Sequence, residues 1–197
     1  MELSVTGVVL AAGAAERMGA PKLLLPFDKS TILNATLASV EASAVDRVIV
    51  VTGANAPEVE SSIAADRAST VRNPDYRRGN MSSFITAATS DPESSAFILV
   101  PGDLPTIQTD ILNRMVGLWR TSEPWAAVTS YADGVAHPFL VSRGALDVAA
   151  HTSGEKVLGR LLVESDDARV VRLVVPTRAP RDVNTPEDYE ALKDDRR

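Results

Sequence analysis

Two basic residues stand in a loop of small residues near the start of this 197-residue sequence. The loop contains Leu10, Ala11, Ala12, Gly13, Arg17 and Lys22. Small residues let a backbone approach a ligand closely, and successive N–H groups can bind a phosphate. The loop is not a Walker A motif, because neither of its glycines precedes Lys and Ser or Thr, and it contains no G-x-G-x-x-G fingerprint. Small residues together with two cations nevertheless favour a phosphate site over an ordinary surface loop.

Three oxygen-bearing side chains are candidates for holding a metal ion. Asp103 lies in the turn Gly-Asp-Leu-Pro that follows an apolar run at 96–100, and Asp182 and Asn184 alternate in a segment near the C-terminus. Mg²⁺ typically takes one or two carboxylates and completes its shell with water and phosphate oxygens. A turn or helix-capping role is the alternative for each of these residues.

The composition excludes several classes of protein. The net charge is 20 − 26 = −6, whereas a nucleic-acid binder needs a basic face. The absence of cysteine excludes disulfides, cysteine-ligated zinc, iron–sulfur clusters and thiol catalysis. The longest apolar runs are far shorter than the ~20 residues that span a bilayer, and residues 1–10 lack the basic start of a signal peptide. We therefore expect one cytoplasmic domain over residues 1–197.

Short β-branched runs alternate with longer helical patterns. Strands are predicted at 5–10, 47–52, 96–100, 126–131, 138–141 and 169–175. Helices are predicted at 32–42, 57–67, 82–89, 109–119, 144–150, 157–164 and 186–193, the last with Thr185 as its N-cap. This alternation predicts an α/β fold with a mostly parallel sheet and helices on both faces. Ligands bind such folds beyond the carboxyl ends of the strands, where the loop at 10–22 and the turn at Asp103 both lie.

These segments, in this order, resemble the MobA-like nucleotidyltransferases nearly end to end, and most closely their molybdenum cofactor cytidylyltransferase branch. The loop from Leu10 to Lys22 is similar to that family's nucleotide loop, and the turn around Asp103 is similar to its magnesium motif. Supporting similarities are Asn73, Gly79 and Ser83 in a second motif, the pair His137-Pro138, and the closing motif at 182–188.

The resemblance implies a Rossmann-like nucleotidyltransferase fold with a mostly parallel mixed sheet. It also implies transfer of a nucleoside monophosphate from a nucleoside triphosphate, with CTP favoured, to the terminal phosphate of molybdopterin, with release of pyrophosphate. The implied nucleotide-binding residues are Leu10, Ala11, Ala12, Gly13, Arg17, Lys22, Asn73, Gly79, Ser83 and Asp103. Arg17, Lys22 and Asp103 are the implied catalytic residues. Asp103 would hold Mg²⁺, or Mn²⁺, with Asn184 or Asp182 completing the site.

The acceptor side is implied to include His137, Glu155 and Lys156. The sequence at 154–159, Gly-Glu-Lys-Val-Leu-Gly, departs there from the Gly-Asp-x-Gly-Ala-Arg pattern of the cytidylyltransferases. A nucleotidyltransferase acting on a sugar phosphate or another phosphorylated acceptor is therefore an alternative. The resemblance further implies a monomer or weak oligomer that contacts a molybdoenzyme or cofactor chaperone transiently.

The expected preference for CTP rests on Ala12. Guanylyl-transferring relatives commonly read Leu-Ala-Gly-Gly at this point, and an extra methyl group would crowd a purine more than a pyrimidine. A GTP-using guanylyltransferase is the alternative. A nucleotide-binding cofactor chaperone without activity is a third alternative, against which the intact Arg17, Lys22 and Asp103 argue.

Overall fold

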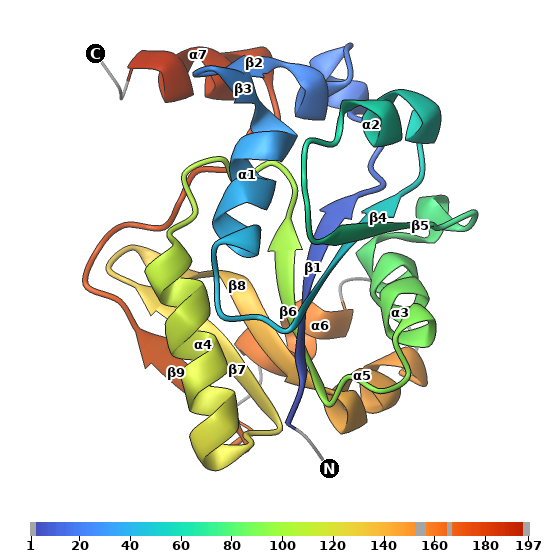
Figure 1. The fold of residues 1–197 in the computed structure, drawn as a ribbon. Helices are drawn as coiled ribbons and strands as arrows, with labels where there is room; N and C mark the ends of the chain where they lie inside the picture. Colours follow the sequence, from blue (N-terminus) through green and yellow to red (C-terminus); the bar gives the residue numbers. More distant parts are fainter. Residues whose placement is uncertain (1–2, 153–156, 165–166, 195–197) are drawn as a thin grey trace.

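A seven-stranded sheet forms the centre of the molecule (Figure 1). The computed structural model describes residues 3–152, 157–164 and 167–194. The strand order across the sheet is β5 (Ala68–Arg72), β4 (Arg47–Thr52), β1 (Val5–Ala11), β6 (Ala96–Pro101), β8 (Gly134–Ser142), β7 (Ala126–Tyr131) and β9 (Val170–Val174). Neighbouring strands are parallel except where β8 pairs with β6 and β7. The predicted α/β fold with a mostly parallel mixed sheet is confirmed.

Helices cover both faces of this sheet and enclose two cores. The first core includes side chains of α1 (Ile32–Glu41), α2 (Ala56–Ser62), α4 (Thr109–Ser122) and α7 (Pro186–Asp194). The second includes side chains of α3 (Asn80–Ser90), α5 (Arg143–Ala150), α6 (Val157–Gly159) and the π-helical turn Arg160–Glu164. Val9 of β1 belongs to the first core and Val8 to the second, because successive strand side chains point to opposite faces. Within the described ranges, no helix is long and apolar enough to cross a membrane.

The strand order reverses at β1. The chain passes from β1 through α1 to β4 on one side, and it returns through α3 to β6 on the other side (Figure 1). In open α/β sheets such a reversal leaves a crevice at the carboxyl ends of the two central strands. The loop after β1 and the turn after β6 therefore meet at this crevice, as the sequence predicts.

Two small elements differ from the prediction. The edge strand β5 was not predicted, because Ser69, Thr70 and Arg72 are exposed and polar there. A short hairpin of β2 (Pro26–Phe27) and β3 (Ser30–Thr31) was also missed, since strands of two residues carry no periodic signal. Strand β8 begins at Gly134, four residues before the predicted start.

Helix α2 ends at Ser62, whereas the sequence predicts a helix as far as residue 67. The side chain of Asn34, on α1, explains the difference. Its Nδ2 donates to the Ser62 carbonyl oxygen (2.8 Å), and its Oδ1 accepts from the N–H of Ala64 (3.1 Å). This cap comes from a neighbouring helix, so it leaves no signal in the sequence around Ser62.

Candidate active site

Lys22 lies between two oxygen-bearing side chains at the central crevice. Its Nζ is 2.5 Å from Oδ2 of Asp103 and 3.1 Å from Oδ1 of Asn184. The side chains of Lys22 and Asp103 are only 17% and 11% exposed. Three residues that the sequence singled out, on separate segments, therefore converge around one positive charge.

The turn at Asp103 is fixed by backbone contacts on two sides. The N–H of Gly102 donates to the Leu10 carbonyl oxygen (2.9 Å), and the Thr36 hydroxyl donates to the Gly102 carbonyl oxygen (3.0 Å). The N–H of Val183 donates to the Asp103 carbonyl oxygen (3.3 Å), while the Val183 side chain is fully buried. The carboxylate is thus held by β1, α1 and the closing segment together.

Gly102 allows the close approach of this turn to β1. A Cβ atom at Gly102 would lie 2.7 Å from the Leu10 carbonyl oxygen and 3.2 Å from a methyl group of Leu33. We expect Gly102→Ala to lower the free energy of unfolding by ~1–3 kcal/mol, as overpacking does, and to impair activity because Asp103 moves. Urea unfolding and turnover measure the two effects.

Gly117→Ala is the matched control for this prediction. Gly117 lies within α4, and a Cβ there would meet nothing within 4 Å. Ala is favoured over Gly inside a helix by ~0.5–1 kcal/mol, so this variant should be more stable than the wild type. Equal stability of the Gly102→Ala variant and the wild type would contradict the assigned close approach.

Asn184 is oriented by charges on both sides of its amide. Its Oδ1 accepts from Nη2 of Arg17 (3.1 Å) as well as from Lys22, and its Nδ2 donates to Oδ2 of Asp182 (2.5 Å). A carboxylate in place of Asn184 could not donate to Asp182 and would repel it. The neutral amide of Asn184 therefore suits its neighbour Asp182.

A reciprocal cap fixes the closing segment at the start of α7. The Asp188 carboxylate accepts from the N–H groups of Asn184 (3.0 Å) and Thr185 (2.8 Å), and the Thr185 hydroxyl accepts from the N–H of Asp188 (3.2 Å). These backbone bonds, with the charge of Arg17 as a lesser cause, lower the pKa of Asp188. The predicted N-cap at Thr185 is confirmed, and it also positions Asn184.

The convergent oxygens fit a hard divalent cation. Asp103 and Asn184 direct a carboxylate oxygen and an amide oxygen at the same ammonium group, so they could direct them at a metal ion. Asp182 faces the nitrogen side of the Asn184 amide, which favours Asn184 over Asp182 as the second ligand. No cluster of three or more His, Cys, Asp or Glu side chains suited to a metal occurs among the described residues. The protein would thus supply few ligands, as is usual for Mg²⁺.

The loop after β1 is open at its tip and packed at its base. Gly13 is exposed, and a Cβ atom there would meet nothing within 4 Å. Ala12 is only 6% exposed, and its carbonyl oxygen accepts from the N–H of Ala54 (3.1 Å). A Cβ on Gly53 would lie 2.8 Å from Cβ of Tyr76 and 2.9 Å from Cβ of Ala12. The Ala12 methyl group therefore packs towards Gly53 and Tyr76.

Asn73 and Ser83 are buried, with exposed fractions of 2% and 3%. Nδ2 of Asn73 donates to the hydroxyls of Ser82 (2.8 Å) and Ser83 (3.0 Å), and its Oδ1 accepts from the N–H of Asp75 (2.9 Å). Gly79 takes a φ of 91° just before α3, a conformation that favours glycine. These residues shape the wall beside the loop after β1, and their contact with nucleotide stays a prediction.

His137 lines a cavity of about 630 Å³ between β8, α3 and α6. Its Nδ1 lies 3.2 Å from the Leu99 carbonyl oxygen, and its ring centroid is 4.1 Å from that of Phe139. Burial lowers the pKa of His137 to about 4, although the bond to Leu99 and the charge of Asp182 oppose the shift. Its ring is therefore neutral near pH 7. Glu155 and Lys156, which the resemblance places on the same side, lie outside the described residues.

Sequence reasoning found the charged residues of the site and missed those that hold them. Thr36 is a fully buried hydroxyl in the apolar face of α1, and a polar residue at such a position is a signal that could have drawn attention. Gly53 carries no comparable signal, because its importance depends on a contact between distant segments.

Comparison with known proteins shows the family to which this chain belongs. Residues 7–170 match the MobA-like NTP transferase domain family. Molybdenum cofactor cytidylyltransferase of Escherichia coli (strain K12) is 28% identical over 188 residues, which are 95% of this chain and 94% of that protein. Nicotine blue oxidoreductase of Paenarthrobacter nicotinovorans is 27% identical over 154 residues, which are 75% of this chain and 76% of that protein.

Solved structures agree with the fold along nearly the whole chain. Rv0371c from Mycobacterium tuberculosis H37Rv superposes with a TM-score of 0.86 at 32% identity, covering 98% of this chain and 100% of that chain. A complex of Rv0371c with manganese has a TM-score of 0.79 at 32% identity, covering 96% and 97% of the two chains. A nucleotidyl transferase from Methanothermobacter thermautotroptrophicus shares the fold, with a TM-score of 0.80 at 24% identity and coverage of 98% and 97%.

Proposed function

Because this chain belongs to the MobA-like NTP transferase family and is a nucleotidyltransferase, we propose that it transfers CMP from CTP to the terminal phosphate of molybdopterin, releasing pyrophosphate. The observation that carries the proposal is the convergence of Lys22, Asp103 and Asn184 at the crevice beside the loop after β1. The similarity to molybdenum cofactor cytidylyltransferase over 95% of the chain supports this choice of acceptor and nucleotide.

The reaction joins two anions, and the site supplies positive charge where it is needed. An oxygen of the acceptor phosphate attacks the α-phosphorus of CTP, forming one P–O bond while the bond to pyrophosphate breaks. The attacking oxygen is already an anion, so no strong general base is required. Lys22 neutralises charge that develops at the α-phosphate, and Arg17 binds the leaving pyrophosphate. Both side chains contact Oδ1 of Asn184, so the two cations lie close together.

Asp103 and Asn184 would hold a Mg²⁺ ion in this proposal. Such an ion, when bound, neutralises phosphate charge and helps to orient the triphosphate. Their oxygens are of the type that Mg²⁺ and Mn²⁺ both prefer, and a manganese complex of the relative Rv0371c supports the use of a divalent cation. Asp188 and Val183 act indirectly, because they position the segment that carries Asn184.

Base selection is proposed to depend on the packed base of the loop after β1. The methyl group of Ala12 faces Gly53 and Tyr76, so it keeps the loop and the neighbouring wall at a fixed separation. A larger purine then has less room than a pyrimidine. The effect of one methyl group on such a choice is ~10–200-fold in kcat/KM.

A pyrophosphate-release assay tests the function. We expect release with CTP, Mg²⁺ and molybdopterin carrying molybdenum, and a kcat/KM for CTP that exceeds that for GTP by ~10–200-fold. Ala12→Gly should lower the ratio of the two kcat/KM values, since it removes the methyl group that sets the separation. The ratio in wild type and variant is the measurement.

Each outcome of this assay tests one alternative to the proposed function. A wild-type preference for GTP would favour a guanylyltransferase and contradict the cytidylyl assignment. Release with sugar phosphates but not with molybdopterin would overturn the acceptor. If no combination of nucleotide and acceptor releases pyrophosphate, a nucleotide-binding chaperone becomes the better interpretation of the function. An unchanged ratio in the Ala12→Gly variant would contradict only the role of Ala12 in base selection and would leave the rest of the proposal intact.

A further inference from the structure

Three side chains form a polar cluster at the carboxyl ends of β4 and β5. The Thr52 hydroxyl donates to Oε1 of Glu60 on α2 (2.7 Å). The Arg72 guanidinium donates to both oxygens of the same carboxylate, from Nε to Oε1 (2.7 Å) and from Nη2 to Oε2 (2.6 Å). The bonds from Arg72, and then the bond from Thr52, lower the pKa of Glu60 to about 2, so its carboxylate is ionised at pH 7. Glu60 thus ties α2 to the last residue of each strand.

The cluster lies in the same row of the sheet as the end of β1. Ala11 pairs with Thr52, and Thr52 pairs with Arg72. Because the three strands are parallel, their carboxyl ends lie at one edge of the sheet, which is the edge of the crevice. Helix α2 packs against β4 at this edge (Figure 1). The cluster is therefore one strand away from the loop after β1, although none of its three residues is an implied nucleotide-binding residue.

Each strand end in the cluster leads directly into the wall of the site. Thr52 precedes Gly53, where the chain packs against Ala12, and Arg72 precedes the buried Asn73. The N–H of Asn73 donates to the Thr52 carbonyl oxygen (2.8 Å). Gly53 and Asn73 both lie just beyond their strands, so their separation depends on how the two strand ends are held. The bonds to Glu60 hold both ends.

The exposure of the ion pair separates its effect on geometry from its effect on stability. The side chains of Arg72 and Glu60 are 62% and 23% exposed. Ion pairs at a protein surface contribute little to the free energy of unfolding, because water solvates both charges when they are apart. Without Glu60, the fully buried Thr52 hydroxyl keeps only a long contact with the Val71 carbonyl oxygen (3.5 Å). Loss of Glu60 should therefore leave the fold intact and release the ends of β4 and β5.

We propose that Glu60 is a positioning residue for nucleotide binding, which holds Gly53 and Asn73 at the separation that a pyrimidine nucleotide requires. The inference rests on the proposed function for the identity of the nucleotide as CTP. Glu60 acts through Thr52 and Arg72 and does not itself touch the nucleotide. Its loss weakens binding of CTP more than binding of GTP, because the wall that favours the smaller base no longer has a fixed shape.

Isothermal titration calorimetry of the full chain with CTP or GTP, in Mg²⁺ and without acceptor, tests this role. We expect Glu60→Ala to raise the Kd for CTP by ~2–30-fold, the range for residues that act on a site through other residues, and to raise the Kd for GTP less. Adding Arg72→Ala to Glu60→Ala should have no further effect, because Arg72 acts through Glu60. Unchanged Kd values in Glu60→Ala, or a further loss in the double variant, would overturn the proposal.

Arg120→Ala is the matched control for the loss of an ion pair. Arg120 on α4 contacts Asp46 (3.0 Å), which lies just before the amino end of β4 and so at the opposite edge of the sheet. In urea unfolding this variant and Glu60→Ala should both lose little stability. Only Glu60→Ala should change the Kd for CTP. An equal rise of this Kd in the two variants would show that Glu60 merely stabilises the fold.

Glu60→Gln tests whether the hydrogen bonds of Glu60 carry the effect. Its amide oxygen can still accept from Thr52 or Arg72, so its Kd for CTP should lie between those of the wild type and Glu60→Ala. A Kd no lower than that of Glu60→Ala would contradict positioning through these bonds. In turnover assays, Glu60→Ala should raise KM and leave kcat unchanged, since the contacts of Lys22 are kept. A fall in kcat with unchanged KM would contradict the role.

The titration needs no acceptor, so its outcome is independent of the proposed transfer reaction. If pyrophosphate release fails with molybdopterin but the Kd for CTP depends on Glu60, the proposed function falls and the positioning role stands. If release with CTP succeeds but the Kd does not depend on Glu60, the function stands and the role of Glu60 falls.

Discussion

Asp103→Asn is expected to lower turnover at least ~100-fold, the scale of one lost electrostatic group in an active site. The substitution keeps the shape of the side chain and removes the charge that faces Lys22 and, in the proposed reaction, the metal ion. The backbone contacts of the turn use the Gly102 N–H and the Asp103 carbonyl oxygen, so the fold should survive. The measurements are kcat at saturating CTP and the Mg²⁺ concentration that gives half-maximal rate, which should rise.

Asp110→Asn is the control for this variant. Asp110 is an exposed acid in the first turn of α4, away from Lys22, so its loss should leave turnover unchanged. Near-normal turnover of the Asp103→Asn variant at saturating Mg²⁺ would remove Asp103 from the metal site. Circular dichroism of both variants separates loss of chemistry from loss of fold.

Lys22→Ala should reduce the rate of the chemical step by about 100-fold and the affinity for nucleotide much less. The reason is that charge at the α-phosphate increases in the transition state, so an adjacent ammonium group binds that state better than the ground state. Single-turnover rates, with nucleotide Kd from titration, distinguish the two effects. Lys22 is placed for this role by Asp103 and Asn184, which hold its Nζ at the crevice.

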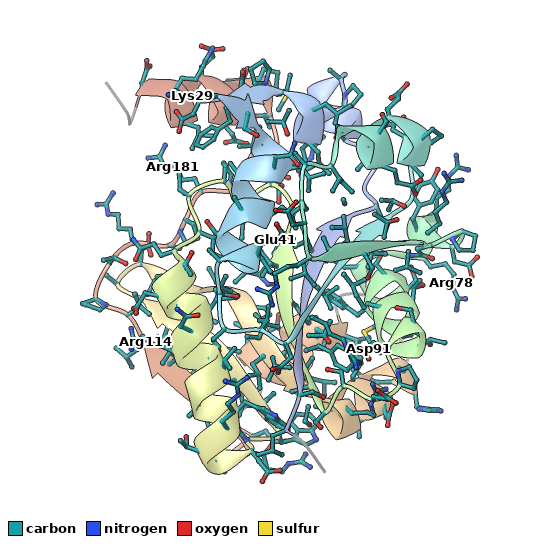
Figure 2. All side chains as sticks on the ribbon, in the orientation of Figure 1. Lys29, Glu41, Arg78, Asp91, Arg114 and Arg181 are labelled. Carbon is teal, nitrogen blue, oxygen red and sulfur yellow. The ribbon has the colours of Figure 1, made fainter. Side chains whose placement is uncertain are left out.

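Lys29→Ala is the control for the loss of one positive charge outside the site. Lys29 is exposed in the turn between β2 and β3, at the top of Figure 2. The Lys29→Ala substitution removes the same charge without changing a contact of Asp103 or Asn184. The rate of the chemical step and the affinity for nucleotide should therefore both stay at wild-type values. If Lys22→Ala instead raises KM with kcat unchanged, Lys22 only binds substrate and its proposed part in the chemistry is wrong.

The long buried elements could be predicted from the sequence because their pattern is local. The apolar runs of β4 and β6 are typical of strands covered on both faces, and the charged residues that follow β1 and β6 are placed by topology alone. Thr185 and Asp188 lie three residues apart, so the cap of α7 is also a local pattern.

The missed features depend on contacts between distant segments. The end of α2 is determined by Asn34 on another helix, and the edge strand β5 is polar because it is exposed. Gly53 matters only because Ala12 and Tyr76 meet there. The cavity at His137 likewise forms between β8, α3 and the helix at 157–159, which are separated by many residues in the chain.

The contact of the closing segment with Asp103 has a consequence for the order in which the protein becomes functional during synthesis. Arg17 and Lys22 are translated early, whereas Asn184 and Val183 leave the ribosome only after all seven strands have been made. A nascent chain that has already formed its sheet still lacks the amide that joins the two cations. The group of side chains around Lys22 is therefore completed only with the last part of the chain, together with the first core, to which Val183 and Leu192 also belong.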